Sequence, residues 1–167
     1  MRRITDVRLP HPRLGDTDQR HTLTLDQNLN IQAIQRMAAG DAEAANNWKG
    51  DWISPRGIDL QINGGLGLAF PELTPADLPR LLQLLELLWQ DGVEAIAPTL
   101  VTCGVAPLRQ ALAVLREARS KAGAGCCRLL GAHLEGPFLA EARRGAHPRE
   151  HLAAPSLNAL QERIGGF

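Results

Sequence analysis

Strands and helices alternate regularly after Pro55, and this alternation restricts the possible folds more than any other feature of the chain. Apolar stretches typical of buried strands are centred near residues 60, 95 and 131, about 36 residues apart. An amphipathic helix is predicted in each interval. Such strand–helix–strand units make right-handed crossovers, which place successive strands parallel. The pattern therefore predicts an α/β fold with a parallel sheet.

The boundaries of these elements follow from local signals. Thr74 before Pro75, with Asp77 in the first turn, is a strong helix start, and Gly92 supplies the stop. The strands are predicted at 57–62, 93–97 and 127–134, and the second helix at 105–122.

Three parallel strands alone would leave two bare edges, which such sheets rarely tolerate. An eight-stranded barrel with this repeat needs roughly 250 residues. We therefore expect residues 56–167 to form the first βα units of a truncated barrel.

The first 55 residues have a different pattern. Polar and apolar residues alternate over 21–25 and 29–33, with a turn at 26–28 between them, so these segments are predicted to be short strands. Residues 36–49 are rich in Ala, Asn, Asp and Gly, which indicates an exposed loop. Residues 1–55 are expected to form a separate small β domain.

The composition excludes several classes of partner. Lys plus Arg equals Asp plus Glu at 18 each, so no basic surplus favours nucleic acid or a membrane surface. The most apolar stretch, 78–89, is interrupted by polar residues and is too short to span a bilayer. Three cysteines without Cys-x-x-Cys spacing fit reduced thiols. We expect a cytoplasmic protein that binds neither nucleic acid nor membrane.

Polar residues collect where the predicted strands end, which is where active sites of parallel barrels lie. The segment most indicative of a functional site is Gly131-Ala-His-Leu-Glu-Gly-Pro-Phe138, in which rigid backbone on both sides holds Glu135. Such a carboxylate suits a metal ligand or a general base, but a solvated or salt-bridged strand end fits the residues equally well. The strand-end residues are Gln61, Asn63, Thr99, Thr102, His133 and Glu135.

Three motifs together resemble the N-acetylglucosamine-6-phosphate deacetylases of the amidohydrolase superfamily. They are Gly57-Ile-Asp-Leu-Gln-Ile-Asn-Gly-Gly65, His133-Leu-Glu-Gly-Pro-Phe138 and Arg144-Gly-Ala-His147. The resemblance runs from about residue 52 to 148. It implies a partial TIM-type (β/α)8 barrel, here its first three strands, preceded by strands of a small β-sandwich that the two chain ends would form. It also implies deacetylation of N-acetylglucosamine 6-phosphate to glucosamine 6-phosphate and acetate, by a homo-oligomer when full length.

The resemblance assigns roles to five positions. Glu135 would bind one divalent metal ion, zinc or similar, and Ala146 and His147 would contact the substrate near its acetamido group. Gln61 and Asn63 replace the His-x-His of two-metal relatives, and neutral amides are poorer ligands for such ions, so the single-metal branch is implied. Two His ligands, the general-base Asp and the phosphate-binding residues are expected beyond Phe167. No catalytic residue is therefore assigned within the chain, and we expect it to be inactive alone.

Two other interpretations remain beside this one: an amidohydrolase acting on a related amino sugar, and a non-catalytic sugar-binding remnant. His133 is either support for the metal site or a core histidine, and His11 and His21 are expected to be structural or exposed. No nucleophile role is expected for Cys103, which has no His close in sequence.

Two further motifs are weaker. His147-Pro-Arg-Glu-His151 matches an inverted zincin motif, but Pro148 opposes the helix interior that this motif needs. Asn63-Gly-Gly-Leu-Gly67 is better explained as a tight turn than as a phosphate loop.

Overall fold

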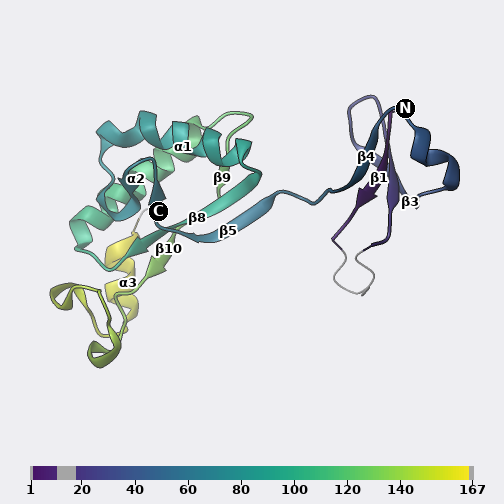
Figure 1. Cartoon of the computed structure of the whole chain (residues 1–167). Helices are drawn as coiled ribbons and strands as arrows, with labels where there is room; N and C mark the ends of the chain where they lie inside the picture. Colours follow the sequence, from purple (N-terminus) through teal and green to yellow (C-terminus); the bar gives the residue numbers. More distant parts are fainter. Residues whose placement is uncertain (1, 11–17, 166–167) are drawn as a thin grey trace. The chain divides into compact units, whose positions relative to one another are not determined.

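The computed structural model describes residues 2–10 and 18–165, and the chain divides into two compact units, residues 1–55 and 56–167 (Figure 1). His11 lies outside the described residues. Among the helices of the described part, none is long and apolar enough to cross a membrane.

The first unit is a four-stranded sheet whose strand order is β3-β2-β1-β4. Strand β1 pairs antiparallel with β2 and parallel with β4, and β2 pairs antiparallel with β3. Large apolar side chains remain exposed on this sheet, including Ile31, Ile34, Trp48 and Trp52. The strands are β1 (Arg2–Arg8), β2 (His21–Leu25), β3 (Ile31–Arg36) and β4 (Asn47–Trp52).

The strand prediction at 21–25 is confirmed, whereas the second strand begins two residues later than predicted. The turn is longer because the Asp26 carboxylate accepts hydrogen bonds from the backbone N–H groups of Asn28 and Asn30, at 2.8 and 2.9 Å. These bonds also hold the pKa of Asp26 below its usual value, with the Asn30 bond as the largest cause.

The prediction of an exposed loop at 36–49 is wrong in part, because this segment holds a 3-10 helix (Ala39–Glu43) and the start of β4. The cause is Asp41, whose carboxylate accepts a hydrogen bond from the Thr22 hydroxyl and another from Arg3, both at 2.7 Å. The Thr22 bond is the largest cause that lowers the pKa of Asp41. Such side-chain anchoring ties the segment to the sheet and has no local sequence signature.

The second unit contains the parallel sheet that the alternation predicts. Strand β8 lies between β5 and a third strand formed by β9 and β10, and all these pairings are parallel. The third strand was predicted to be continuous over 127–134 but is interrupted between Leu129 and His133. The strands are β5 (Gly57–Ile62), β8 (Val93–Val101), β9 (Arg128–Leu129) and β10 (His133–Glu135).

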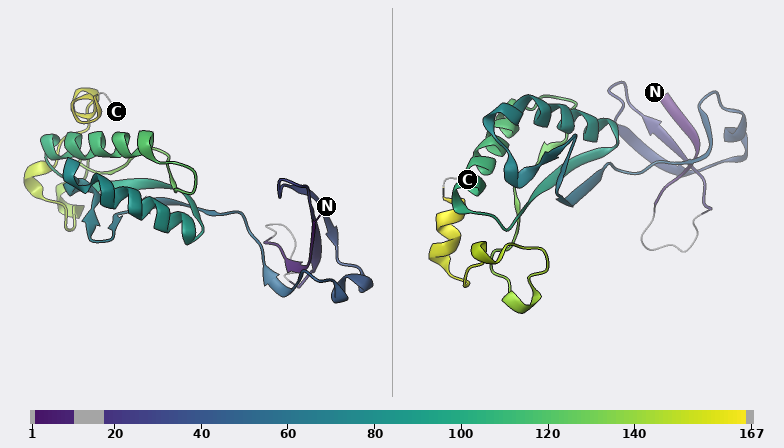
Figure 2. Two further views of the ribbon diagram at one scale, coloured as in Figure 1. Left: turned by 90° about the horizontal axis from the view of Figure 1, so that it is seen from above. Right: turned by 60° about the vertical axis from the view of Figure 1, so that its left-hand side comes forward.

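Helices α1 (Leu78–Gln90) and α2 (Val105–Lys121) lie against this sheet (Figure 2). The start of α1 is confirmed, because the Asp77 carboxylate accepts hydrogen bonds from the N–H and the hydroxyl of Thr74, at 3.0 and 2.8 Å. These helices and the sheet enclose one apolar core, whose fully buried members include Phe70, Leu81, Leu85, Ile96 and Leu100.

Strand β5 was predicted to be buried, and this prediction is wrong for the described structure. Ile58 and Leu60 are 55% and 66% exposed. Ile58 and Leu60 are two residues apart and therefore point to the same face of the sheet, and the described residues leave that face of β5 uncovered. Parallel strands are usually buried on both faces, so these exposed side chains mark a surface that a complete sheet of this kind would cover.

Shorter elements complete the unit. A hairpin of β6 (Gly64–Gly65) and β7 (Leu68–Ala69) follows β5, and the 3-10 helices Phe70–Glu72 and Pro75–Asp77 lead into α1. After β10 come the 3-10 helices Glu141–Arg143 and Arg149–His151 and the helix α3 (Leu157–Ile164), which the sequence did not indicate.

The Cys127 thiol lies in the apolar core of the second unit and is expected to resist alkylation in the folded protein. Cys127 is fully buried, and this burial raises the pKa of its thiol to about 11. Because the thiolate is the reactive form, Cys127 should react with iodoacetamide at least ~100-fold more slowly than a free thiol. Peptide mapping by mass spectrometry can compare it with its neighbour Cys126, which is partly exposed. Equal labelling of the two thiols in the folded protein would contradict the described packing.

Candidate functional site

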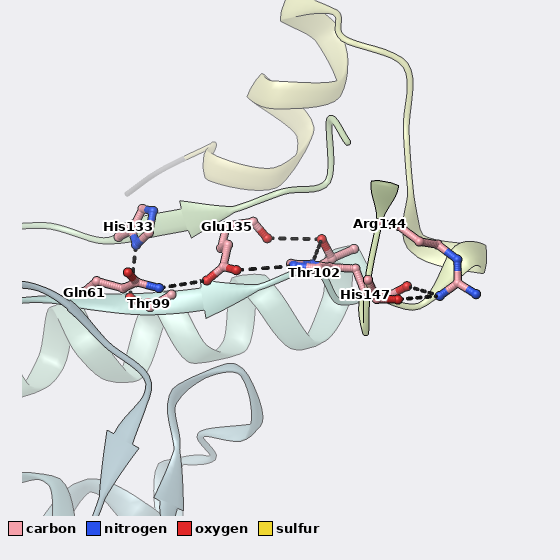
Figure 3. Close-up of polar contacts among 8 residues, drawn as sticks. Gln61, Thr99, Thr102, His133, Glu135, Arg144 and His147 are labelled. Carbon is pink, nitrogen blue, oxygen red and sulfur yellow. Dashed lines mark hydrogen bonds and ion pairs between the residues drawn. The ribbon is translucent and has the colours of Figure 1, made fainter. Parts of the chain in front are cut away.

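The carboxyl ends of the three parallel strands bring polar side chains from distant parts of the chain together (Figure 3). In the register of the sheet, His133 lies beside Thr99 and Glu135 beside Val101, so β8 and β10 end at the same edge. Gln61 at the end of β5 reaches the same place through its side chain. The sequence prediction that these strand ends share one edge agrees with this geometry.

Glu135 lies between two neighbours, Gln61 and His147, as Figure 3 shows. One carboxylate oxygen, Oε2, accepts a hydrogen bond from Gln61 Nε2 at 3.4 Å, and the other, Oε1, lies 3.3 Å from His147 Nε2. The side chain is 35% exposed, so the carboxylate is fixed at the strand ends and still open to a ligand. It does not extend alone into bulk solvent.

His147 is held by a closed turn of the chain. Its N–H donates to the Arg144 carbonyl at 3.1 Å, and Arg144 Nη1 donates back to the His147 carbonyl at 2.7 Å. Gly145 adopts a φ of +59°, which a glycine accommodates without strain. The ring itself is 15% exposed and lies 2.8 Å from the Thr102 hydroxyl through Nδ1.

A cavity of about 280 Å³ opens at these side chains. A second cavity of about 570 Å³ shares part of its wall, including Asn63, Thr102 and Ala146. Ligand sites are usually concave, with a few polar groups on a largely apolar wall, and the paired cavities fit that description. The smaller cavity is lined by Gln61, Asn63, Val101, Thr102, Glu135, Ala146, His147 and Pro148.

His133 belongs to the same strand face but makes a separate contact. Its Nδ1 lies 3.1 Å from the hydroxyl of Thr99, which is fully buried. One ring nitrogen is thus satisfied inside the protein, in keeping with a structural histidine.

Neither of the two weaker motifs, residues 147–151 and 63–67, forms the site that its sequence pattern resembles. Residues Arg149–His151 form only a short 3-10 helix after Pro148, so His147 and His151 do not share a helix as a zincin motif requires. In the glycine-rich segment, Leu66 and Gly67 have φ values of 50° and 76° and form a tight turn between β6 and β7. The tight-turn interpretation is confirmed.

No protein-family model matches the chain. Its sequence is 35% identical over 119 residues to the N-acetylglucosamine-6-phosphate deacetylase of Bos taurus, which covers 69% of this chain and 28% of that protein. It is 31% identical over 143 residues to the enzyme of the same name from Vibrio furnissii, covering 85% of this chain and 35% of that protein. The chain is a relative of the N-acetylglucosamine-6-phosphate deacetylases. The resemblance that the motifs indicated is thereby confirmed, and the chain spans about a third of the length of these relatives.

Solved structures of deacetylases have the same fold. The enzyme from Thermotoga maritima matches with a TM-score of 0.67 at 21% identity, over 96% of this chain and 39% of that one. The enzyme from Mycobacterium smegmatis matches with a TM-score of 0.66 at 21% identity, over 98% and 43% of the two chains. At this identity the likeness concerns the fold, which is of the mixed α/β class that the sequence predicts.

A deacetylase relative raises the question of whether these residues fit a divalent metal ion. Among the described residues, no group of three or more His, Cys, Asp or Glu side chains is arranged to hold one. Glu135 supplies one suitable oxygen ligand, with the Gln61 amide beside it. Within the described residues, this donor set could supply at most one side of a metal site.

The sequence placed Thr102 among the polar strand-end residues and Gly136 in the rigid backbone after Glu135, but it did not reveal the contacts that these two residues make in the structure. Thr102 contacts the backbone of Glu135 and the ring of His147. Gly136 has a φ of +93° and leaves room for Thr102. The signal available for Thr102 was its place among the polar residues that follow the strand predicted at 93–97.

Proposed function

We propose that this chain contributes part of the active site of a metal-dependent hydrolase that deacetylates N-acetylglucosamine 6-phosphate to glucosamine 6-phosphate and acetate. The observation that carries the proposal is the Glu135 carboxylate, fixed at the strand ends beside His147 and open to a cavity. The names of the relatives supply the substrate and the reaction.

The proposal extends to the architecture of the whole protein. The bare edge of β5, with exposed Ile58 and Leu60, supports a (β/α)8 barrel of which this chain forms the first three strands. The exposed apolar side chains of the first unit, such as Trp48 and Trp52, support a second sheet packed on it as a small β-sandwich. The cytoplasmic location and the homo-oligomeric state stay predictions.

Glu135 would hold the metal ion, one per site, zinc or similar. When bound, such an ion polarises a carbonyl group and lowers the pKa of a water molecule, which is the chemistry that amide hydrolysis needs. Gln61 would keep the carboxylate in place through its side-chain amide.

The remaining residues of the site would bind and orient the sugar. Ala146 and His147 line the cavity next to Glu135, within reach of an acetamido group bound there. The turn closed by Arg144 fixes the backbone of His147, and the Thr102 hydroxyl lies 2.8 Å from the ring. The ring would therefore be held in place before substrate binds, which lowers the entropy lost on binding.

A second substrate is supported by one specific relative. The chain is 36% identical over 95 residues to an N-acetylgalactosamine-6-phosphate deacetylase from Shewanella sp. (strain ANA-3), which covers 57% of this chain and 23% of that protein. The two sugars differ only in the configuration of one hydroxyl group, so the same cavity could accept either.

Acetate release from the two sugar phosphates tests the proposed function. A full-length version of the protein, supplied with zinc, should release acetate from N-acetylglucosamine 6-phosphate faster than from the galactose isomer. The reverse order would favour the second substrate. Stoichiometric metal binding without acetate release from either sugar would contradict both, and would favour a non-catalytic sugar-binding role.

A further inference from the structure

The larger cavity at the strand ends, of about 570 Å³, has far more room than an acetyl group requires. A water molecule, which is similar in size to a methyl group, occupies only about 30 Å³ in the liquid. The cavity reaches inward to Thr99, which is fully buried. Because the two cavities share part of their walls, a group bound beside Glu135 can extend into the larger one. The residues that line both cavities are Asn63, Val101, Thr102, Ala146 and Pro148.

The wall of the larger cavity suits an apolar chain. Its two buried hydroxyl groups already have partners inside the protein: Thr99 contacts His133 Nδ1, and Thr102 donates to the carbonyl of Glu135, each at 3.1 Å. An apolar group that displaces water from this cavity would therefore not leave either hydroxyl without a hydrogen bond. The apolar side chains of the wall include Ala69, Pro71, Val101, Pro107, Ala146 and Pro148.

The charge of the wall disfavours a phosphate group. Among the described residues that line the larger cavity, His151 is the only basic one, and Glu72 places a carboxylate on the same wall. A phosphate monoester carries a charge of about −1.5 to −2 near pH 7. It would meet the like charge of Glu72 and would find no Lys or Arg side chain there. The phosphorylated end of a sugar phosphate is therefore expected to point away from this cavity.

The geometry of an amide decides which part of a substrate enters the cavity. A secondary amide is planar and strongly prefers the trans form, in which its two carbon substituents lie on opposite sides of the C–N bond. With the carbonyl group beside Glu135, one substituent extends into the larger cavity and the other extends away from it. Because the phosphorylated sugar is disfavoured there, the acyl chain is the substituent that enters.

We propose that the larger cavity is an acyl-chain subsite, so that the site accepts N-acylglucosamine 6-phosphates with chains longer than acetyl, such as N-butyryl. This inference rests on the proposed function, because it takes the amide carbonyl to react beside Glu135. The reaction is the same hydrolysis: water adds to the carbonyl carbon, the C–N bond breaks, and the nitrogen takes up the proton. The products are butyrate and glucosamine 6-phosphate, and no further reactant is needed.

Hydrolysis of the N-acetyl and N-butyryl compounds by a full-length version of the protein, supplied with zinc, tests the subsite. Burial of each added methylene group strengthens binding by about fourfold, whereas a pocket shaped for a methyl group alone rejects an added methylene by about 10-fold or more. The kcat/KM for the butyryl compound is therefore expected to be at least about one-tenth of that for the acetyl compound. A smaller value overturns the inference.

A variant that fills the cavity provides a second test. A Cβ atom added to Gly104 would lie 3.4 Å from Pro107 Cδ and 3.6 Å from His151 Cε1, at ordinary contact distances within the cavity wall. Gly104→Leu should therefore occupy the cavity and lower the ratio of butyryl to acetyl hydrolysis by at least ~10-fold. Gly123→Leu is the matched control, because a Cβ atom there meets nothing within 4 Å and Gly123 does not line this cavity. Its ratio should stay at the wild-type value.

The outcomes separate this inference from the proposed function. Hydrolysis of the acetyl compound alone would leave the proposed function intact and overturn the subsite, as would an unchanged ratio in Gly104→Leu. If Gly104→Leu does not fold, the two wild-type rates still decide. Hydrolysis of neither compound would contradict the proposed function, and the subsite with it.

Discussion

Glu135→Gln is expected to lower both bound metal and the rate of deacetylation by at least ~100-fold in a full-length version of the protein. Glutamine keeps the size of the side chain and its contact with Gln61 but loses the negative charge that a divalent cation requires. Catalytic zinc sites typically have only three protein ligands, so losing the one carboxylate weakens the metal site severely.

Metal analysis of the purified variant, together with acetate release, measures this effect. Glu141→Gln is the matched control, because Glu141 lies on an exposed 3-10 helix and pairs with Arg149 at 2.8 Å, away from the strand ends. The control should keep its metal and its activity. Normal metal content in Glu135→Gln would remove this residue from the metal site.

His147→Ala is expected to retain its metal, unlike Glu135→Gln, but to lose turnover by about 10²–10⁴-fold. The ring is not required to hold the metal in this account, but Nε2 faces the cavity in which the acetamido group would react. His21→Ala, in strand β2 of the first unit, is the control and should leave turnover unchanged. Full turnover in His147→Ala would refute the substrate-contacting role.

Much of the second unit could be predicted because its signals are local. The Thr74 and Asp77 pair starts α1 through bonds made within one turn, and the strand–helix alternation alone determines a parallel sheet. The shared edge of the strand ends follows from the same pattern, so Glu135 could be placed at a site from its position in the chain.

What the sequence did not reveal depends on contacts between distant residues. Strand β4 pairs with β1 across about 40 residues, and Asp41 accepts hydrogen bonds from Arg3 and Thr22. Neither the strand pairing nor these hydrogen bonds can be recognised from a local sequence pattern. The contact of Thr102 with His147 joins residues 45 positions apart.

The most direct test of this account is anomalous diffraction from zinc in crystals of the full-length protein. The account predicts one metal peak about 2.0–2.2 Å from a carboxylate oxygen of Glu135, the distance usual for zinc and a carboxylate. A metal bound elsewhere, with the Glu135 carboxylate making no contact to it, would contradict the central claim.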